Sequence, residues 1–264
     1  MSRWLVGAFG LLVFLLSAGP ALAQADDDSN PMSAAGGPDQ SVPLPWTRSI
    51  RCPVLYTHEV GSAANFRRLL LGLRAGGFQP TSLASIDAAM SGAAETPPGC
   101  LLLTFDDGLY SQYANALPVL NDLGLPGVFF VLPGFADGVH RYMGAAEYRA
   151  LVDAGEEVEA HTCNHPILPT LARLNLNAFF GELEDCRRLL EGIIGTRVDY
   201  LAYPFGAYDA TVLDGMRRFN FRAGFSTRAA AILTAASPYT LPRIRYDPAE
   251  SAAVVIRRIH AAGG

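Results

Sequence analysis

Residues 101–108 read Leu-Leu-Leu-Thr-Phe-Asp-Asp-Gly, and this stretch decides the fold. An apolar run closed by turn-forming residues is typical of a strand buried on both faces, as in a parallel sheet covered by helices. The two carboxylates then stand where the strand ends. In (β/α) folds the reactive groups gather at that end of the strands, so we expect a functional site here.

Strand-like and helix-like segments alternate on both sides of this stretch. The expected strands are residues 53–56, 101–105, 128–132, 158–160, 198–202, 221–225 and 241–246. The expected helices are residues 64–75, 110–123, 145–154, 176–194, 210–219 and 252–260. Alternation with short loops indicates a parallel sheet covered by helices. Seven strands in one domain favour an α/β fold with a closed or nearly closed barrel over an open sheet.

The N-terminus predicts export. Arg3 precedes an apolar run over residues 5–16, and Ala21-Leu22-Ala23 matches a signal-peptidase cleavage pattern. We therefore expect a signal peptide over residues 1–23, a flexible leader over 24–49 and a catalytic domain over 50–264. An uncleaved anchor is the alternative. The run is too short for a comfortable membrane span, so we expect a periplasmic or secreted protein with no stable span after cleavage.

The composition excludes several classes of function. The formal net charge is −5 and no basic stripe exists, so a nucleic-acid partner has no support. The chain contains no lysine, which excludes Schiff-base chemistry and P-loop nucleotide binding. Neither a dinucleotide-binding glycine motif nor a serine-hydrolase elbow is present. The sequence does not indicate an oligomeric state.

Four cysteines allow disulfides in an exported protein. Cys52 lies six residues before His58, and Cys100 lies six residues before Asp106. Both cysteines thus open apolar runs at the same level, which makes a Cys52–Cys100 disulfide a reasonable hypothesis. A Cys163–Cys186 disulfide is the weaker hypothesis, because no pattern places those two residues side by side.

Asp106 and Asp107 repel each other unless a cation or a proton offsets their charge. Side chains alternate along an extended chain, so the two carboxylates point in different directions. One can bind a metal while the other stays free to accept a proton. An ordinary Asp-Asp-Gly turn is the alternative.

Residues 161–166 (His-Thr-Cys-Asn-His-Pro) follow another buried strand. Pro166 disfavours helical geometry at His165, so His161 and His165 are expected on a loop from which both can reach one ion. Surface histidines are the alternative. Two histidines and one aspartate leave a coordination position open, as in catalytic zinc sites.

Three motifs occur in order: residues 104–108 (Thr-Phe-Asp-Asp-Gly), 161–166, and 202–206 (Ala-Tyr-Pro-Phe-Gly). Together they resemble the polysaccharide deacetylase family (carbohydrate esterase family 4, the NodB-homology domain). Residues 55–58 (Leu-Tyr-Thr-His) resemble the entry strand of the branch with an N-terminal Tyr-His strand. Residues 241–244 (Leu-Pro-Arg-Ile) are similar to its late strand. The resemblance covers residues 53–247 and implies a distorted (β/α) barrel.

The resemblance implies metal-dependent removal of acetyl groups from N-acetylated sugars of an envelope or extracellular polysaccharide. Asp107, His161 and His165 would hold a divalent metal, most often zinc. Asp106 would be the general base, and the backbone N–H of Tyr203 would help to stabilise the oxyanion.

Two departures from the family pattern concern the acid and an arginine. The late Leu-x-His motif is missing, so His58 is the expected acid and His260 the alternative. Ala202 stands where many members have an arginine that orients the catalytic aspartate, and Arg243 could compensate. His140 is expected to be solvent-exposed.

Two other functions fit the same site less well. A glycan-binding accessory module would keep the metal but has no need of the second carboxylate, Asp106. An amidase acting on another small amide or a peptide would resemble a branch that is usually intracellular, which disagrees with the expected signal peptide.

Overall fold

The computed structural model describes residues 44–136 and 141–263. The predicted signal peptide, most of the predicted leader and His140 lie outside the described residues. Within the described part, no helix is long and apolar enough to cross a membrane.

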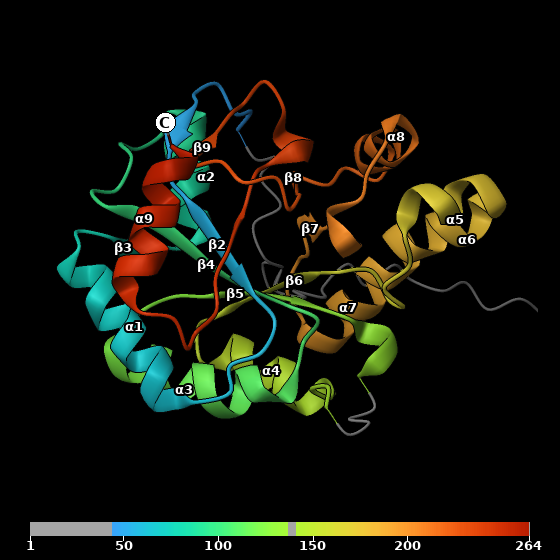
Figure 1. Ribbon diagram of the computed structural model, residues 1–264. Coiled ribbons are helices and arrows are strands. Elements are labelled where there is room, and N and C mark those ends of the chain that lie inside the picture. The colour runs from blue at the N-terminus through green and yellow to red at the C-terminus, as the bar shows by residue number, and fades with distance from the viewer. Residues whose placement is uncertain (1–43, 137–140, 264) are drawn as a thin grey trace, which may run out of the picture. The chain divides into compact units, whose positions relative to one another are not determined.

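Seven parallel strands form a curled sheet with helices around it, a distorted (β/α) barrel in one domain (Figure 1). The strands in spatial order are β10 (Ile244–Arg245), β2 (Val54–Thr57), β4 (Cys100–Asp106), β5 (Val128–Val131), β6 (Glu157–Ala160), β7 (Tyr200–Ala202) and β8 (Ala223–Phe225). The short β3 (Gln79–Pro80) pairs with the start of β4, and β1 (Ile50–Arg51) pairs antiparallel with β9 (Ile232–Leu233). The expectation of a seven-stranded (β/α) barrel is confirmed.

Helices connect these strands. They are α1 (Ala63–Ala75), α2 (Leu83–Ser91), α3 (Leu117–Leu123), α4 (Ala145–Asp153), α5 (Leu168–Leu174), α6 (Leu176–Phe180), α7 (Cys186–Ile194), α8 (Ala210–Arg218) and α9 (Ala252–Ala262). π-Helical turns precede α3 (Gln112–Ala116) and join α6 to α7 (Gly181–Asp185). Short 3₁₀ turns cover Pro133–Phe135, Pro204–Gly206 and Pro238–Thr240. The sequence patterns did not predict α2 and α5.

Segment 241–245 lies between the two edges of the curled sheet. Leu241 forms a parallel bridge with Phe225 at the end of β8, while Ile244 pairs with Leu55 of β2. The segment, which contains β10, thus pairs with both β8 and β2 and closes the barrel at this level. It also carries Arg243, which is completely buried.

Strand β4 shows how the sequence positions the site. Leu101, Leu103 and Phe105 pack into the core between the sheet and its helices. Cys100 and Leu102 belong to the second apolar cluster, inside the barrel. Because side chains alternate along a strand, Asp106 continues the inward-facing series.

Residues 44–49 differ from the expected flexible leader. The Trp46 indole N–H donates a 2.8 Å hydrogen bond to Asp87 on α2. The guanidinium of Arg222 stacks 5.2 Å from the Trp46 ring centroid and also bonds Asp87. The amide N–H of Thr47 donates to the carbonyl of Met90. These contacts anchor residues 44–49 to the barrel.

Candidate active site

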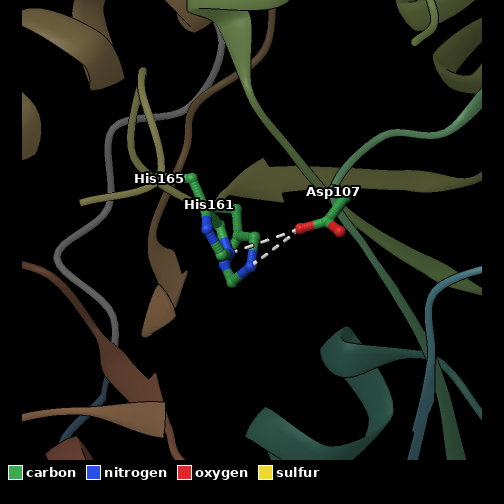
Figure 2. A group of neighbouring side chains, drawn as sticks. All are labelled: Asp107, His161 and His165. Carbon is green, nitrogen blue, oxygen red and sulfur yellow. Dashed lines mark ion pairs between the residues drawn. The ribbon is translucent and has the colours of Figure 1, made fainter. Parts of the chain in front are cut away.

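Asp107, His161 and His165 converge at the carboxyl ends of the strands (Figure 2). Asp107 directly follows β4 and has a φ of 75°, and Gly108 continues the turn with a φ of 66°. This left-handed turn directs the Asp107 carboxylate toward the two imidazoles, which lie on the loop after β6. The structure therefore brings together the three residues predicted as metal ligands.

The distances between these ligand atoms fit one shared cation. Oδ1 of Asp107 lies 3.4 Å from Nε2 of His161 and 3.4 Å from Nε2 of His165. Two ligands bound about 2.0–2.1 Å from a tetrahedral zinc ion are separated by about 3.3–3.4 Å. Oδ1 of Asp107 is also buried without a hydrogen-bond partner. Buried polar atoms are normally paired, so an ion explains this atom well.

His161 is held in the form that binds metals. Its Nδ1 lies 2.7 Å from the carbonyl oxygen of Ala202, which can only accept a hydrogen bond. Nδ1 therefore carries a proton, and in the neutral imidazole the lone pair is on Nε2, which faces Asp107. Such outer contacts fix the tautomer and orientation of metal-binding histidines.

The charges of the cluster suit the same role. Burial raises the pKa of Asp107, but the interaction with His161 outweighs burial and holds this pKa below its ordinary value. Burial, reinforced by His161, lowers the pKa of His165. An ionised carboxylate and the Nε2 atoms of two imidazoles together form a donor set that suits a divalent cation.

Asp106 is paired with Arg243 inside the barrel. Two guanidinium nitrogens donate hydrogen bonds of 2.7 Å, one to each carboxylate oxygen. Burial raises the pKa of Asp106, but the charge of Arg243 outweighs it and the pKa is lowered. The pair keeps Asp106 ionised and fixes its orientation, while each oxygen retains a second lone pair. Arg243 thus makes the contact with Asp106 that the resemblance assigns to an arginine at position 202.

His58 faces the same site. It follows β2 and lines a cavity of about 1010 Å³ together with Asp107 and Arg243. The amide of Gln112 donates to the backbone carbonyls of His58 (2.6 Å) and Asp106 (2.5 Å). The sequence analysis did not predict Gln112. This residue begins a π-helical turn, a feature that is typical of functional sites.

His260, the alternative acid, lies at the opposite end of the barrel. It is exposed on α9, and its ring lies 6.1 Å from that of Phe78, just before β3. Strand β3 pairs with the first residues of β4, whereas Asp106 is the last residue of that strand. The structure thus excludes His260 from the site formed by Asp106 and Asp107.

The predicted role of Tyr203 is wrong. Its backbone N–H donates a 3.0 Å hydrogen bond to the carbonyl of Phe225, which joins β7 to β8. This donor is therefore not available to an oxyanion.

Two residues on, Phe205 has a φ of 59°, is exposed, and has its ring 4.6 Å from that of His165. Phe205 is thus the residue of this motif that lies against His165 of the candidate ligand cluster, and the Pro-Phe-Gly turn was the signal for it.

Both disulfides are present. The Cys52–Cys100 disulfide confirms the stronger hypothesis. The Cys163–Cys186 disulfide, which was the weaker hypothesis, is present as well. Cys163 lies on the loop between His161 and His165, and Cys186 begins α7. No sequence pattern indicated this contact, because it depends on how the intervening helices α5 and α6 fold back on each other.

Comparison with known proteins identifies the family. A family model with the description "polysaccharide deacetylase" matches residues 93–224, which are half of the chain. The chain belongs to the polysaccharide deacetylase family. It is accordingly a hydrolase, a polysaccharide N-deacetylase, with a polysaccharide substrate.

One curated relative of this deacetylase matches most of the chain, and a second matches a quarter of it. YxkH of Bacillus subtilis (strain 168), named for the same family, is 24% identical over 81% of this chain and 77% of its own length. A poly-beta-1,6-N-acetyl-D-glucosamine N-deacetylase of Escherichia coli (strain K12) is 37% identical over 65 residues, which are 25% of this chain and 10% of that protein.

Solved structures share the fold of this deacetylase. IcaB from Ammonifex degensii has a TM-score of 0.67 and 26% identity, covering 75% of this chain and 92% of its own. The Streptococcus pyogenes deacetylase PplD, solved with acetate, has a TM-score of 0.72 and 23% identity, covering 80% and 99%.

Proposed function

We propose that this deacetylase removes the acetyl groups of N-acetylglucosamine units in an envelope or extracellular polysaccharide and depends on a divalent metal, with zinc the first candidate. The observation that carries the proposal is the buried, unpartnered Oδ1 of Asp107, at 3.4 Å from Nε2 of both His161 and His165.

Each residue of the site has a chemical role in this proposal. Asp107, His161 and His165 hold the metal. A bound divalent ion supplies a Lewis acid, which polarises the acetamide carbonyl and makes water more acidic. Asp106 accepts the proton of the attacking water, and Arg243 orients Asp106 for that step.

His58 donates a proton to the departing sugar nitrogen. An amide anion is a very poor leaving group, so bond cleavage needs an acid near the nitrogen. The position of His58 beside Asp107 in the cavity supports this role. The cavity is at the upper end of the volumes that enclose small ligands, which suits a segment of polymer.

Export to the periplasm or the exterior remains part of the proposal. It rests on the sequence of residues 1–23, which predicts a signal peptide, with the leader and the catalytic domain following it. A polysaccharide of the envelope would be accessible to an exported enzyme.

The test of the substrate is acetate release from matched oligomers of β-1,6-linked and β-1,4-linked N-acetylglucosamine. The name of the Escherichia coli relative favours the β-1,6-linked oligomers, for which we expect the higher kcat/KM. Release only from acetylated compounds that are not sugars would contradict the proposed substrate class.

A further inference from the structure

The carboxylate of Glu182 accepts hydrogen bonds from the loop that carries both imidazoles. This histidine loop comprises residues 161–165. Oε2 of Glu182 accepts the backbone N–H groups of Cys163 (2.8 Å) and Asn164 (3.1 Å), and Oε1 accepts the side-chain amide of Asn164 (2.7 Å). Glu182 is 9% exposed, so these bonds are shielded from water. Both oxygens of this buried carboxylate thus hold Cys163 and Asn164, which lie between the two histidines.

A covalent link reaches the same point of the loop. Cys163 is bonded to Cys186, which lies four residues after Glu182. The sulfur of Cys186 lies 3.8 Å from Oε2 of Glu182, so the carboxylate and the disulfide meet the loop at one place. Glu182 belongs to a π-helical turn inserted between α6 and α7. Such insertions realign side chains and occur frequently at functional sites.

The conformation of the loop requires outside support. Thr162 has a φ of 70° and His165 a φ of 55°, a region that residues with a β-carbon rarely adopt. Such conformations persist where the surroundings enforce them. The backbone of Gly134 also packs against the loop, since a β-carbon at this position would lie 2.5 Å from the carbonyl oxygen of Cys163. The loop is therefore confined by both Glu182 and Gly134.

We infer that Glu182 and the Cys163–Cys186 disulfide are positioning residues for the metal site, a clamp that presets His161 and His165 before the ion binds. This inference rests on the proposed metal site. Without the clamp, ion binding has to order the loop, and the cost of that ordering weakens affinity. Outer contacts of this kind typically change metal affinity by about 10- to 100-fold.

The second disulfide provides a matched control. Cys52 and Cys100 join the starts of β2 and β4, at the end of the barrel away from Asp107. Removing either disulfide raises the conformational entropy of the unfolded chain to a similar extent. Only the removal of Cys163–Cys186 frees the histidine loop.

The experiment is zinc titration against a chromophoric chelator for the wild type and four variants: C163S/C186S, C52S/C100S, Glu182→Met and Glu182→Gln. We expect C163S/C186S and Glu182→Met to bind zinc about 10- to 100-fold more weakly. C52S/C100S should keep nearly the wild-type affinity. Glu182→Gln retains an oxygen for the two backbone N–H groups, so part of the affinity should return.

A second readout separates positioning from general destabilisation. At saturating zinc, Glu182→Met and C163S/C186S should recover most of kcat, because the bound ion then orders the loop. Equal loss of affinity in both disulfide variants, or unchanged affinity in C163S/C186S and Glu182→Met, would overturn the clamp. A wild type that binds no zinc, nickel or cobalt would instead overturn the proposed metal site, so the two failures are distinguishable.

Discussion

Arg243 donates two hydrogen bonds of 2.7 Å to the two carboxylate oxygens of Asp106, and both side chains are buried. The guanidinium also lies 4.6 Å from the ring centroid of Tyr56, and its Nε donates to the carbonyl of Ser226. Arg243 therefore links the strand that closes the barrel to the carboxylate proposed as the general base. Closure of the fold and orientation of the base depend on the same side chain.

Replacement of Arg243 tests this link. Arg243→Met leaves Asp106 buried without its cation, and breaking a buried pair in this way destabilises proteins by about 3–5 kcal/mol. Misplacement of the base should also lower kcat by on the order of 10²-fold. Urea denaturation and acetate release measure the two effects. Arg188→Met is the control, because Arg188 is 70% exposed and should change stability by less than about 0.5 kcal/mol. Equal effects of the two substitutions would contradict the importance of the pair.

The division of labour between the two adjacent carboxylates can be tested by comparing Asp106→Asn with His165→Ala. Asp106→Asn should lower kcat by about 10²–10⁴-fold with metal still bound, because the general base is lost and the three ligands remain. His165→Ala should instead lower the metal content of the protein, measured by elemental mass spectrometry. Loss of metal from Asp106→Asn would count against its assignment as the base, and unchanged metal content in His165→Ala would remove that residue from the ligands.

Much of this site follows from the sequence because parallel strands bring their ends together. His58, Asp106 and His161 each follow an apolar run that predicts a strand, and this position at the strand end was sufficient to predict their proximity. The error at Tyr203 arose because one hydrogen bond between β7 and β8 decides whether its N–H is free. Glu182 was not predicted because its contact with the histidine loop depends on a π-helical turn, which carries no sequence period.

His58 and His260 provide a matched pair of substitutions. His58→Ala should lower kcat by about 10²–10⁴-fold, since the departing nitrogen loses its proton donor. His260→Ala should leave kcat nearly unchanged, because His260 is exposed on α9 beside Phe78. Steady-state acetate release gives both values. A larger loss in His260→Ala than in His58→Ala would exchange their roles.

Two glutamates of the β6 segment predict how stability depends on pH. Burial raises the pKa of Glu156 and of Glu157 to about 7, although each accepts a backbone N–H, from Gly127 and Leu83 respectively. The folded protein thus binds more protons than the unfolded chain between the ordinary glutamate pKa and about pH 7. The free energy of unfolding should therefore fall as the pH rises through this window, by roughly 3 kcal/mol or less per group.

Denaturation at a series of pH values measures this slope. Glu157→Gln keeps an oxygen for the N–H of Leu83 but cannot ionise, so its slope should be shallower than that of the wild type. Glu95→Gln, at a side chain that is 96% exposed, should keep the wild-type slope. A slope that is the same in all three proteins would show that Glu157 does not contribute to it.

The central claim is that Asp107, His161 and His165 hold a metal on which deacetylation depends. The most direct measurement is acetate release from N-acetylglucosamine oligomers after complete chelation, and again after zinc is added back. We predict that chelation abolishes release and that zinc restores it in the wild type but not in His161→Ala. Full activity after chelation, with metal content verified to be zero, would contradict the claim.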